Sequence, residues 1–203
     1  LTAATAVALA DYVIVSQSGT NKKATVDQLS DAIYSDDWTD LVVSGTAINP
    51  LGAGSDPTLN TSTGLLEFSA SADNLIVFTW QLPHGWAGQF DATKAVVVPH
   101  MHVRHLTSTT APNNVSRWKF EYDVADANGT FTNAYNAWTT LATVSSTNPA
   151  DTTECGIVSF GDLDLAGYGG STILHCRISR LASSDAADND TAVVALYSAD
   201  LHD

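Results

Sequence analysis

The stretch VVVPHMHVRHL, residues 96–106, alternates between apolar and polar side chains. Alternation with a period of two is typical of a β-strand that packs one face against a core. The apolar face consists of Val97, Met101 and Val103. The opposite face carries His100, His102 and Arg104, and we expect these side chains to point away from the core.

Two neighbouring stretches repeat the strand signal in different forms. WKFEYDV at 118–124 places Trp118, Phe120 and Tyr122 on one face and charged residues on the other, which predicts a strand with one solvated side. NLIVFTWQL at 74–82 is apolar on both faces. That strand is therefore expected to be covered twice, by the core and by a second surface.

Short strand-like segments separated by turn residues continue along the rest of the chain. The clearest span residues 64–68, 74–82, 95–106, 116–124, 155–160, 171–180 and 191–200. This spacing predicts an all-β fold, an antiparallel β-sandwich of the jelly-roll-like kind. Residues 44–63, rich in Gly, Ser, Thr and Asn, are expected to form the longest loop.

The first 36 residues differ from this pattern. Residues 11–16 alternate as a short strand, 19–21 have turn composition, and 24–34 have helical spacing with Val26, Leu29 and Ile33 on one stripe. Such a strand-turn-helix segment is too small to bury a core of its own. We therefore expect residues 1–36 to serve attachment to a partner or oligomerisation, and residues 37–203 to form the sandwich domain.

Composition excludes several kinds of partner. The chain carries 22 acidic and eight basic residues among its 203, for a formal net charge of −14. Binding to nucleic acid requires a basic surface, so no nucleic-acid partner is expected. No apolar stretch is long enough to span a membrane, so no insertion is expected either. The two cysteines, Cys155 and Cys176, are expected to be reduced thiols.

The histidines are concentrated in three strings, LPHGW at 82–86, PHMHVRH at 99–105 and DLH at 200–202. His100 and His102 share a strand face, and they could bind a transition-metal ion, either alone or together with His84, Asp200 and His202. They could also form a hydrogen-bonded polar seam between subunits, or a catalytic cluster. For the interface alternative, the expected contact residues are His84, Trp86, His100, His102, Arg104 and His202.

A catalytic function has less support. No G-x-S-x-G string occurs, and the only glutamates, Glu67, Glu121 and Glu154, lie in no recognisable glycosidase motif. The run DAADND at 185–190 lacks the EF-hand signature and has the composition of a solvated turn, with calcium as the alternative. Trp86, Trp138 and Tyr135 could stack on sugars, although aromatic residues in β-proteins more often pack in cores or interfaces. The sequence therefore predicts a protein that is not an enzyme.

The order of the three strings also resembles a C-terminal domain of bacteriophage tail-fibre and virion structural proteins. In that family they typically read QLPHxW, PHxHW and DxHY, and the resemblance here covers roughly residues 65–203. Val103 replaces the family's usual aromatic residue, and the chain ends in Asp203 where the family often has an aromatic residue. The segment 11–32 resembles a short module near the N-terminus of phage fibre and appendage proteins.

The resemblance implies a structural protein of a tailed bacteriophage, a fibre, appendage or decoration subunit that forms a homotrimer. It implies assembly in the cytoplasm of the host bacterium and a final location in the virion. The alternative is a receptor- or carbohydrate-binding module at the tip of a phage fibre, with a host surface receptor or glycan as its partner.

Overall fold

The computed structural model describes residues 12–17, 20–25, 41–48, 55–86, 95–106, 114–125, 131, 137–147 and 154–202. The chain divides into two compact units, residues 1–39 and residues 40–203. Across the described residues, no helix has the length and apolar character needed to cross a membrane.

In the first unit, β1 (Tyr12–Gln17) pairs antiparallel with β2 (Thr20–Thr25). The strand expected at 11–16 is present, but the expected turn at 19–21 and helix at 24–34 are partly wrong, because residues 20–25 are extended. Pairing with β2 supplies hydrogen-bond partners for the backbone of β1, which an isolated strand would lack. The stripe residues Val26, Leu29 and Ile33 lie outside the described residues.

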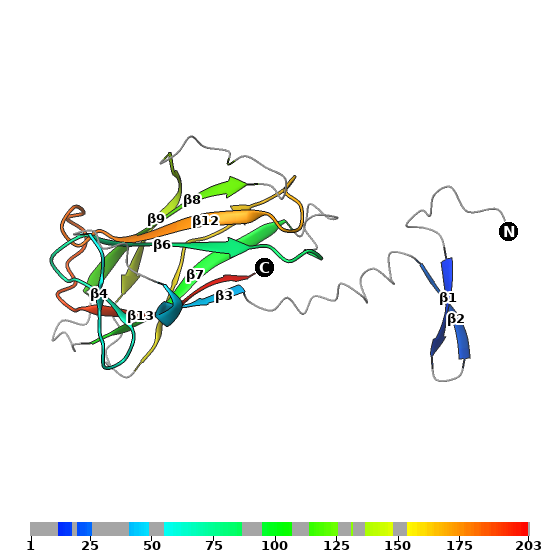
Figure 1. The fold of residues 1–203 in the computed structure, drawn as a ribbon, viewed down its shortest axis with the longest axis horizontal. Helices are drawn as coiled ribbons and strands as arrows, with labels where there is room; N and C mark the ends of the chain where they lie inside the picture. Colours follow the sequence, from blue (N-terminus) through cyan, green and yellow to red (C-terminus); the bar gives the residue numbers. More distant parts are fainter. Residues whose placement is uncertain are drawn as a thin grey trace. The chain divides into compact units, whose positions relative to one another are not determined.

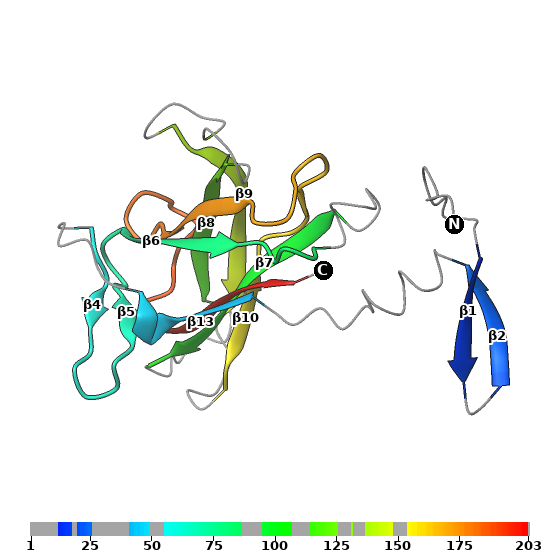
Figure 2. The same ribbon diagram turned by 45° about the vertical axis from the view of Figure 1, so that its right-hand side comes forward.

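The second unit contains two antiparallel sheets, as the sequence predicted for a β-sandwich of jelly-roll-like character (Figures 1 and 2). The larger sheet has seven strands in the order β10-β7-β13-β5-β4, with β11 paired to β7 and β3 paired to β13. Its strands are β3 (Leu41–Ser44), β4 (Thr58–Leu59), β5 (Leu66–Phe68), β7 (Val96–His105), β10 (Gly156–Ser159), β11 (Leu163–Asp164) and β13 (Val194–His202). A 3-10 turn, η1 (Gly45–Ala47), follows β3.

The smaller sheet has four strands in the order β6-β12-β8-β9. Its strands are β6 (Asn74–Gln81), β8 (Val115–Ala125), β9 (Thr139–Thr147) and β12 (Ile173–Arg180). In Figure 1 this sheet lies over the seven-stranded sheet, with β7, β13 and β3 below it.

The core lies between the two sheets. Phe68 of β5 meets Trp118 of β8 edge-to-face, with ring centroids 5.1 Å apart. Phe160, which follows β10, packs against Phe120 of β8 at 5.2 Å. These aromatic contacts join the larger sheet to the smaller one, and burial of such side chains is the main favourable term in folding.

The alternation in β7 gave the correct core face. Val97, Met101 and Val103 are fully buried, and in β12 the side chain of Cys176 is fully buried as well. Both cysteines are free thiols, with Cys155 exposed. Burial raises the pKa of the Cys176 thiol well above its usual range.

The strands that the sequence did not predict are short or polar. β9, with the sequence TTLATVSST, pairs with β8 along its whole length, yet most of its side chains are at least partly exposed. It carries no apolar alternation, so its pairing comes from backbone hydrogen bonds at a sheet edge. β4 and η1 lie within the stretch 44–63 that was expected to be a loop.

Candidate functional site

The outer face of the seven-stranded sheet carries the histidines of β7 beside the end of β13. The two strands are antiparallel, and His100 lies directly opposite Asp200 while His102 lies opposite Ser198. The register shifts between Leu196 and Ser198, where Tyr197 is the extra residue of a β-bulge. The bulge changes the alternation, so that Leu196 is buried in the core but Asp200 projects to the opposite face, toward the histidines.

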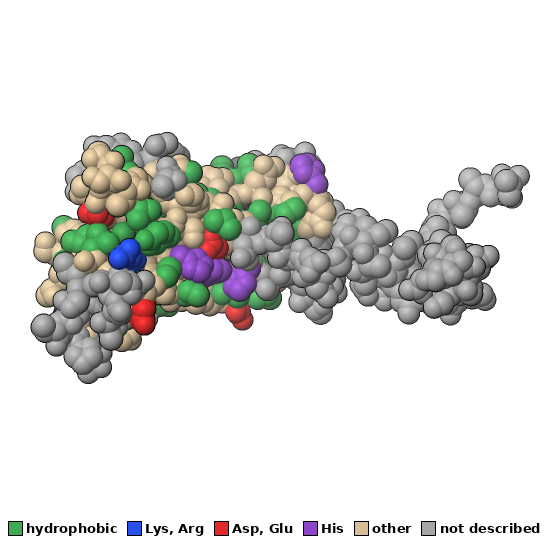
Figure 3. Space-filling model, turned by 90° about the horizontal axis from the view of Figure 1, so that it is seen from below, with side chains coloured by type: hydrophobic (Ala, Val, Ile, Leu, Met, Phe, Trp, Pro, Cys, Tyr) green, Lys and Arg blue, Asp and Glu red, His purple; other side chains and the backbone are tan. Residues whose placement is uncertain are grey.

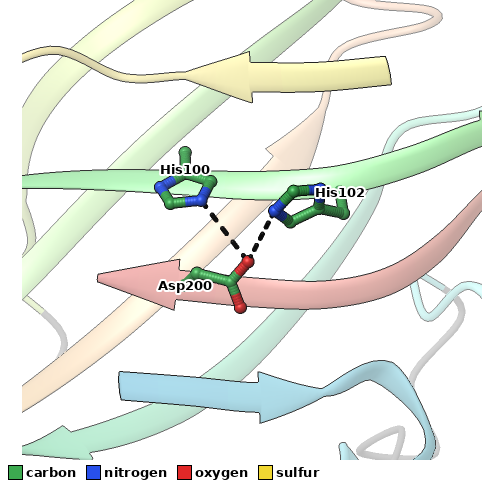
Figure 4. A group of neighbouring side chains, drawn as sticks. All are labelled: His100, His102 and Asp200. Carbon is green, nitrogen blue, oxygen red and sulfur yellow. Dashed lines mark ion pairs between the residues drawn. The ribbon is translucent and has the colours of Figure 1, made fainter. Parts of the chain in front are cut away.

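His100, His102 and Asp200 converge on one point of this face (Figure 4). Nε2 of His102 lies 2.9 Å from Oδ2 of Asp200, and Nε2 of His100 lies 3.4 Å from the same oxygen. Ser198 Oγ donates a hydrogen bond to this oxygen at 3.2 Å. The ring of His202 lies 4.6 Å from that of His100. One carboxylate oxygen is therefore the centre of the group.

Burial sets the electrostatics of the group. The side chains of Asp200 and His100 are 4% and 9% exposed, whereas that of His102 is 33% exposed. Burial lowers the pKa of His100, and although the Val98 carbonyl and Asp200 act in the opposite direction, the net shift is downward. A lowered pKa favours the neutral ring, the form in which imidazole binds metals.

The group has the composition of a metal site. Its candidate ligand atoms all lie within 4.8 Å of one another. Two imidazole nitrogens and a carboxylate oxygen suit zinc and other first-row transition metals. The group could hold such an ion; as a nucleophile site it is poorly arranged, because Ser198 bonds to the aspartate and not to a histidine.

The group borders an open depression of about 420 Å³, which is lined by Val42, His102, Arg104, Cys155, Tyr197, Ser198 and Asp200. Apolar side chains surround it on the same face, because Ile157 pairs with His102 and Val42 pairs with Asp200. Ile157 is 63% exposed and Val42 57% exposed. Figure 3 views this side of the molecule and shows histidines gathered beside an acidic side chain, among hydrophobic ones.

The structure thus brings together the histidines of the PHMH string with Asp200 and His202 of the DLH string. Arg104 is on the same face, where its Nη1 lies 3.4 Å from the Tyr197 hydroxyl. His84 lies elsewhere, exposed in the turn after β6 of the smaller sheet, and no contact among the described residues joins it to the group. Trp86 is only 4% exposed, so it is part of the core of this unit and does not form an exposed contact surface.

A second histidine–carboxylate pair was missed at the sequence level. His105 Nδ1 lies 3.0 Å from Asp190 Oδ2, and both side chains are buried. Arg180, also fully buried, contacts Asp188 at 3.3 Å and donates to the carbonyl oxygens of Asp190 and Ala192 at 2.8 and 2.7 Å. His105 lies two residues after Val103 and therefore on the same, core-facing side of the strand, and this alternation could have predicted its burial.

These contacts correct the interpretation of the run 185–190. The side chains of Asp188 and Asp190 are buried, whereas Ala186, Ala187 and Asn189 are exposed, so the run is a solvated turn only in part. Their carboxylates face Arg180 and His105, and Asp185 pairs with Arg117 at 2.9 Å. Carboxylates already paired with cations are poorly placed to bind calcium, so the loop is an ion-pair network that closes one end of the sandwich.

The outer face of the smaller sheet carries a different cluster. The guanidinium of Arg177 lies 4.8 Å above the ring of Trp138, and the ring of His175 lies 4.7 Å from it. Arg177 also forms a 2.6 Å ion pair with the buried carboxylate of Glu121. Burial lowers the pKa of His175, partly offset by Asp123. An aromatic ring is thus held beside polar groups on a sheet face.

Comparison with known proteins gives no family. No protein-family model matches the chain, and no curated protein matches it. Among solved structures it is similar to an arabinose-bound GH51 α-L-arabinofuranosidase, with 13% identity and a TM-score of 0.31 over 84% of this chain and 23% of that one.

Two further solved structures overlap with much of the chain. Infectious bursal disease virus, Gx strain, gives 8% identity and a TM-score of 0.36 over 93% of this chain and 36% of that one. The CBM22-1 xylan-binding domain of Paenibacillus barcinonensis Xyn10C gives 13% identity and a TM-score of 0.31 over 80% of this chain and 92% of that one. The chain thus spans about a quarter to a third of the first two proteins. Such low TM-scores and identities transfer neither activity nor ligand to this chain.

Proposed function

We propose that this chain is a structural, non-enzymatic subunit of a tailed-bacteriophage virion, a fibre, appendage or decoration protein that forms a homotrimer. Its sandwich is displayed, and residues 1–36 attach it to other virion proteins. The order of the histidine strings supports the virion assignment by resemblance. The net charge of −14 suits a protein that stays soluble when many copies are displayed together.

The observation that carries self-association is the outer face of the seven-stranded sheet. Ile157, Val42, Tyr197 and Val96 are each more than a third exposed there, around the buried His100–Asp200 pair. Exposed apolar side chains around a polar centre are typical of protein interfaces. A second copy is the occupant we propose, because apolar side chains on the same face of each copy can pack against one another about a rotation axis.

The test is the oligomeric state of the purified chain, measured by light scattering after size exclusion. We expect a trimer for the wild type and a monomer for Ile157→Asp, because a charge placed among the apolar side chains of an interface costs desolvation free energy. Leu59→Asp is the matched control, since Leu59 is 48% exposed but pairs with core residue Leu66 and so belongs to the other face. A monomeric wild type, or equal dissociation of both variants, would contradict the proposal.

The non-enzymatic assignment has a separate test. Incubation of the purified chain with surface polysaccharide of candidate hosts should release no new reducing ends. Sustained release that survives further purification would overturn the structural assignment and favour a depolymerase.

Carbohydrate binding is the second candidate function, and the cluster on the smaller sheet favours it. Sugar rings stack on aromatic faces, and the ion pair with Glu121 holds Arg177 beside Trp138. Affinity electrophoresis with host glycans would test it. Binding that is lost in Trp138→Ala but kept in Ile157→Asp would place the ligand on the smaller sheet and establish this second function.

A further inference from the structure

The tautomer of His100 leaves an unusual contact at the centre of the histidine group. Nδ1 of His100 lies 3.4 Å from the carbonyl oxygen of Val98, an acceptor, so in the tautomer that donates to this carbonyl Nδ1 carries the proton of the neutral ring. In that tautomer Nε2 presents a lone pair to the Asp200 carboxylate oxygen at 3.4 Å. A cation between these two acceptors would bind both.

These atoms are shielded from water, since the side chains of His100 and Asp200 are 9% and 4% exposed. The second oxygen of Asp200, Oδ1, is also buried and has no hydrogen-bond partner among the described residues. A divalent cation would compensate both the lone pair and this unpartnered oxygen.

The spacing of the ligand atoms approaches that needed for a single ion. Ligands at about 2.0–2.2 Å from zinc in tetrahedral geometry lie roughly 3.3–3.6 Å from one another. The His100 nitrogen lies 3.4 Å from the Asp200 oxygen and fits this range, the His102 nitrogen at 2.9 Å is closer, and the three ligand atoms lie within 4.8 Å of one another. His102, which is 33% exposed, has room to rotate as the ion binds. The contact between His100 Nδ1 and the Val98 carbonyl is the kind of outer hydrogen bond that orients metal-binding histidines.

From these contacts we propose that His100, His102 and Asp200 bind one divalent transition-metal ion, with Zn²⁺ as the first ion to test. The three protein ligands come from two adjacent strands and leave a coordination position toward the open depression. Water or the nearby His202 ring would occupy that position. All three ligands come from one copy of the chain, so a test of the metal site does not depend on the virion assignment.

The experiment uses the full chain without a histidine tag, stripped of metal with a chelator and titrated with ZnCl₂ in a calorimeter. We expect one equivalent to bind to the wild type. His102→Ala should bind roughly 100-fold more weakly or worse, since loss of even an outer partner costs 10–100-fold. His84→Ala is the matched control, an exposed histidine outside the group, and should bind like the wild type.

Two further variants locate the ion. Cys155 Sγ lies 3.9 Å from His102 Nδ1, the nitrogen that faces away from Asp200, and Cys155→Ser keeps a hydrogen-bonding group there, so it should weaken Zn²⁺ binding far less than His102→Ala. His100→Ala should lose affinity as His102→Ala does. Zn²⁺ should raise the melting temperature of the wild type and of His84→Ala, but not of folded His102→Ala.

The proposal is overturned if the wild type binds no equivalent of Zn²⁺, Co²⁺ or Ni²⁺, or if His102→Ala binds as tightly as the wild type. A loss in Cys155→Ser as large as that in His102→Ala would also overturn it, because the ion would then sit on the other side of the His102 ring. Visible absorption of the Co²⁺ form, compared between these variants, gives a second readout independent of calorimetry.

Discussion

Arg180 is fully buried at the end of β12, where its guanidinium is held by Asp188 and by two backbone carbonyl oxygens. We expect Arg180→Met to lower the free energy of unfolding by about 3–5 kcal/mol, because breaking a buried ion pair leaves a carboxylate buried without its partner. Urea denaturation at neutral pH measures the loss.

The control for this change is Arg104→Met on the outer sheet face. Arg104 is half-buried there, and such surface changes usually alter stability by about 0.5 kcal/mol or less. If the two variants lost equal stability, Arg180 would not hold the loop as described.

Asp190 gives the network a pH dependence. Burial would raise the pKa of Asp190, but hydrogen bonds from His105 and the Ala192 amide, with the charge of Arg180, lower it below its ordinary value of 3.8. The unfolded chain therefore binds this proton more readily than the folded one. The stability contributed by Asp190 is present above the ordinary pKa and is lost as pH falls through the lowered folded pKa.

We accordingly expect the stability difference between wild type and Asp190→Asn to be largest at neutral pH and to shrink as the pH falls below about 4. Asp73 and Asp185 have lowered pKa values as well, so the wild type should still lose some stability in acid when Asp190 is replaced. Urea midpoints across this range measure the effect. A constant difference at all pH values would show that Asp190 does not titrate in this way.

Among the elements, β3 and β13 approach each other closely at Gly45. Gly45 follows β3, and a Cβ placed there would overlap the carbonyl oxygen of Leu196 and lie 3.2 Å from that of Tyr197, the bulged residue. Backbone atoms cannot move aside as a flexible side chain can. We expect Gly45→Ala to cost about 1–3 kcal/mol in unfolding free energy, as overpacking typically does.

Gly156→Ala in β10 is the matched control, because its Cβ would come no closer than 3.7 Å to a Val103 methyl group. Thermal melts of the two variants make the comparison. Equal melting temperatures would mean that the backbone at Gly45 can move away from β13 to admit a methyl group at little cost, contrary to the close approach seen here.

At the scale of the whole molecule, the chain divides at residues 39 and 40, and the second unit contains its own core between two sheets. A chain that lacks residues 1–36 should therefore fold, with a melting temperature close to that of the full chain. Under the proposed function it should no longer be incorporated into particles. Circular dichroism and a particle-incorporation assay measure the two properties, and failure of the shortened chain to fold would contradict the division.

The sequence alone was sufficient for the fold class and for the core face of β7. The alternation at 96–106 correctly predicted a buried row of Val97, Met101 and Val103 and an outward row with His100 and His102. Side-chain alternation is a local property of extended backbone, so it can be read without knowing what the strand pairs with. β9 escaped detection because a polar edge strand carries no such pattern.

The tertiary structure alone decided which groups meet. Asp200 reaches His100 and His102 because the bulge at Tyr197 reverses the alternation of β13, and the local sequence carries no clear sign of that reversal. The contact of His105 with Asp190, and the separation of His84 from the other histidines, likewise depend on how the whole chain packs. Register between strands a hundred residues apart depends on the packing of the whole core, whereas the direction of each side chain from its strand depends only on the strand itself.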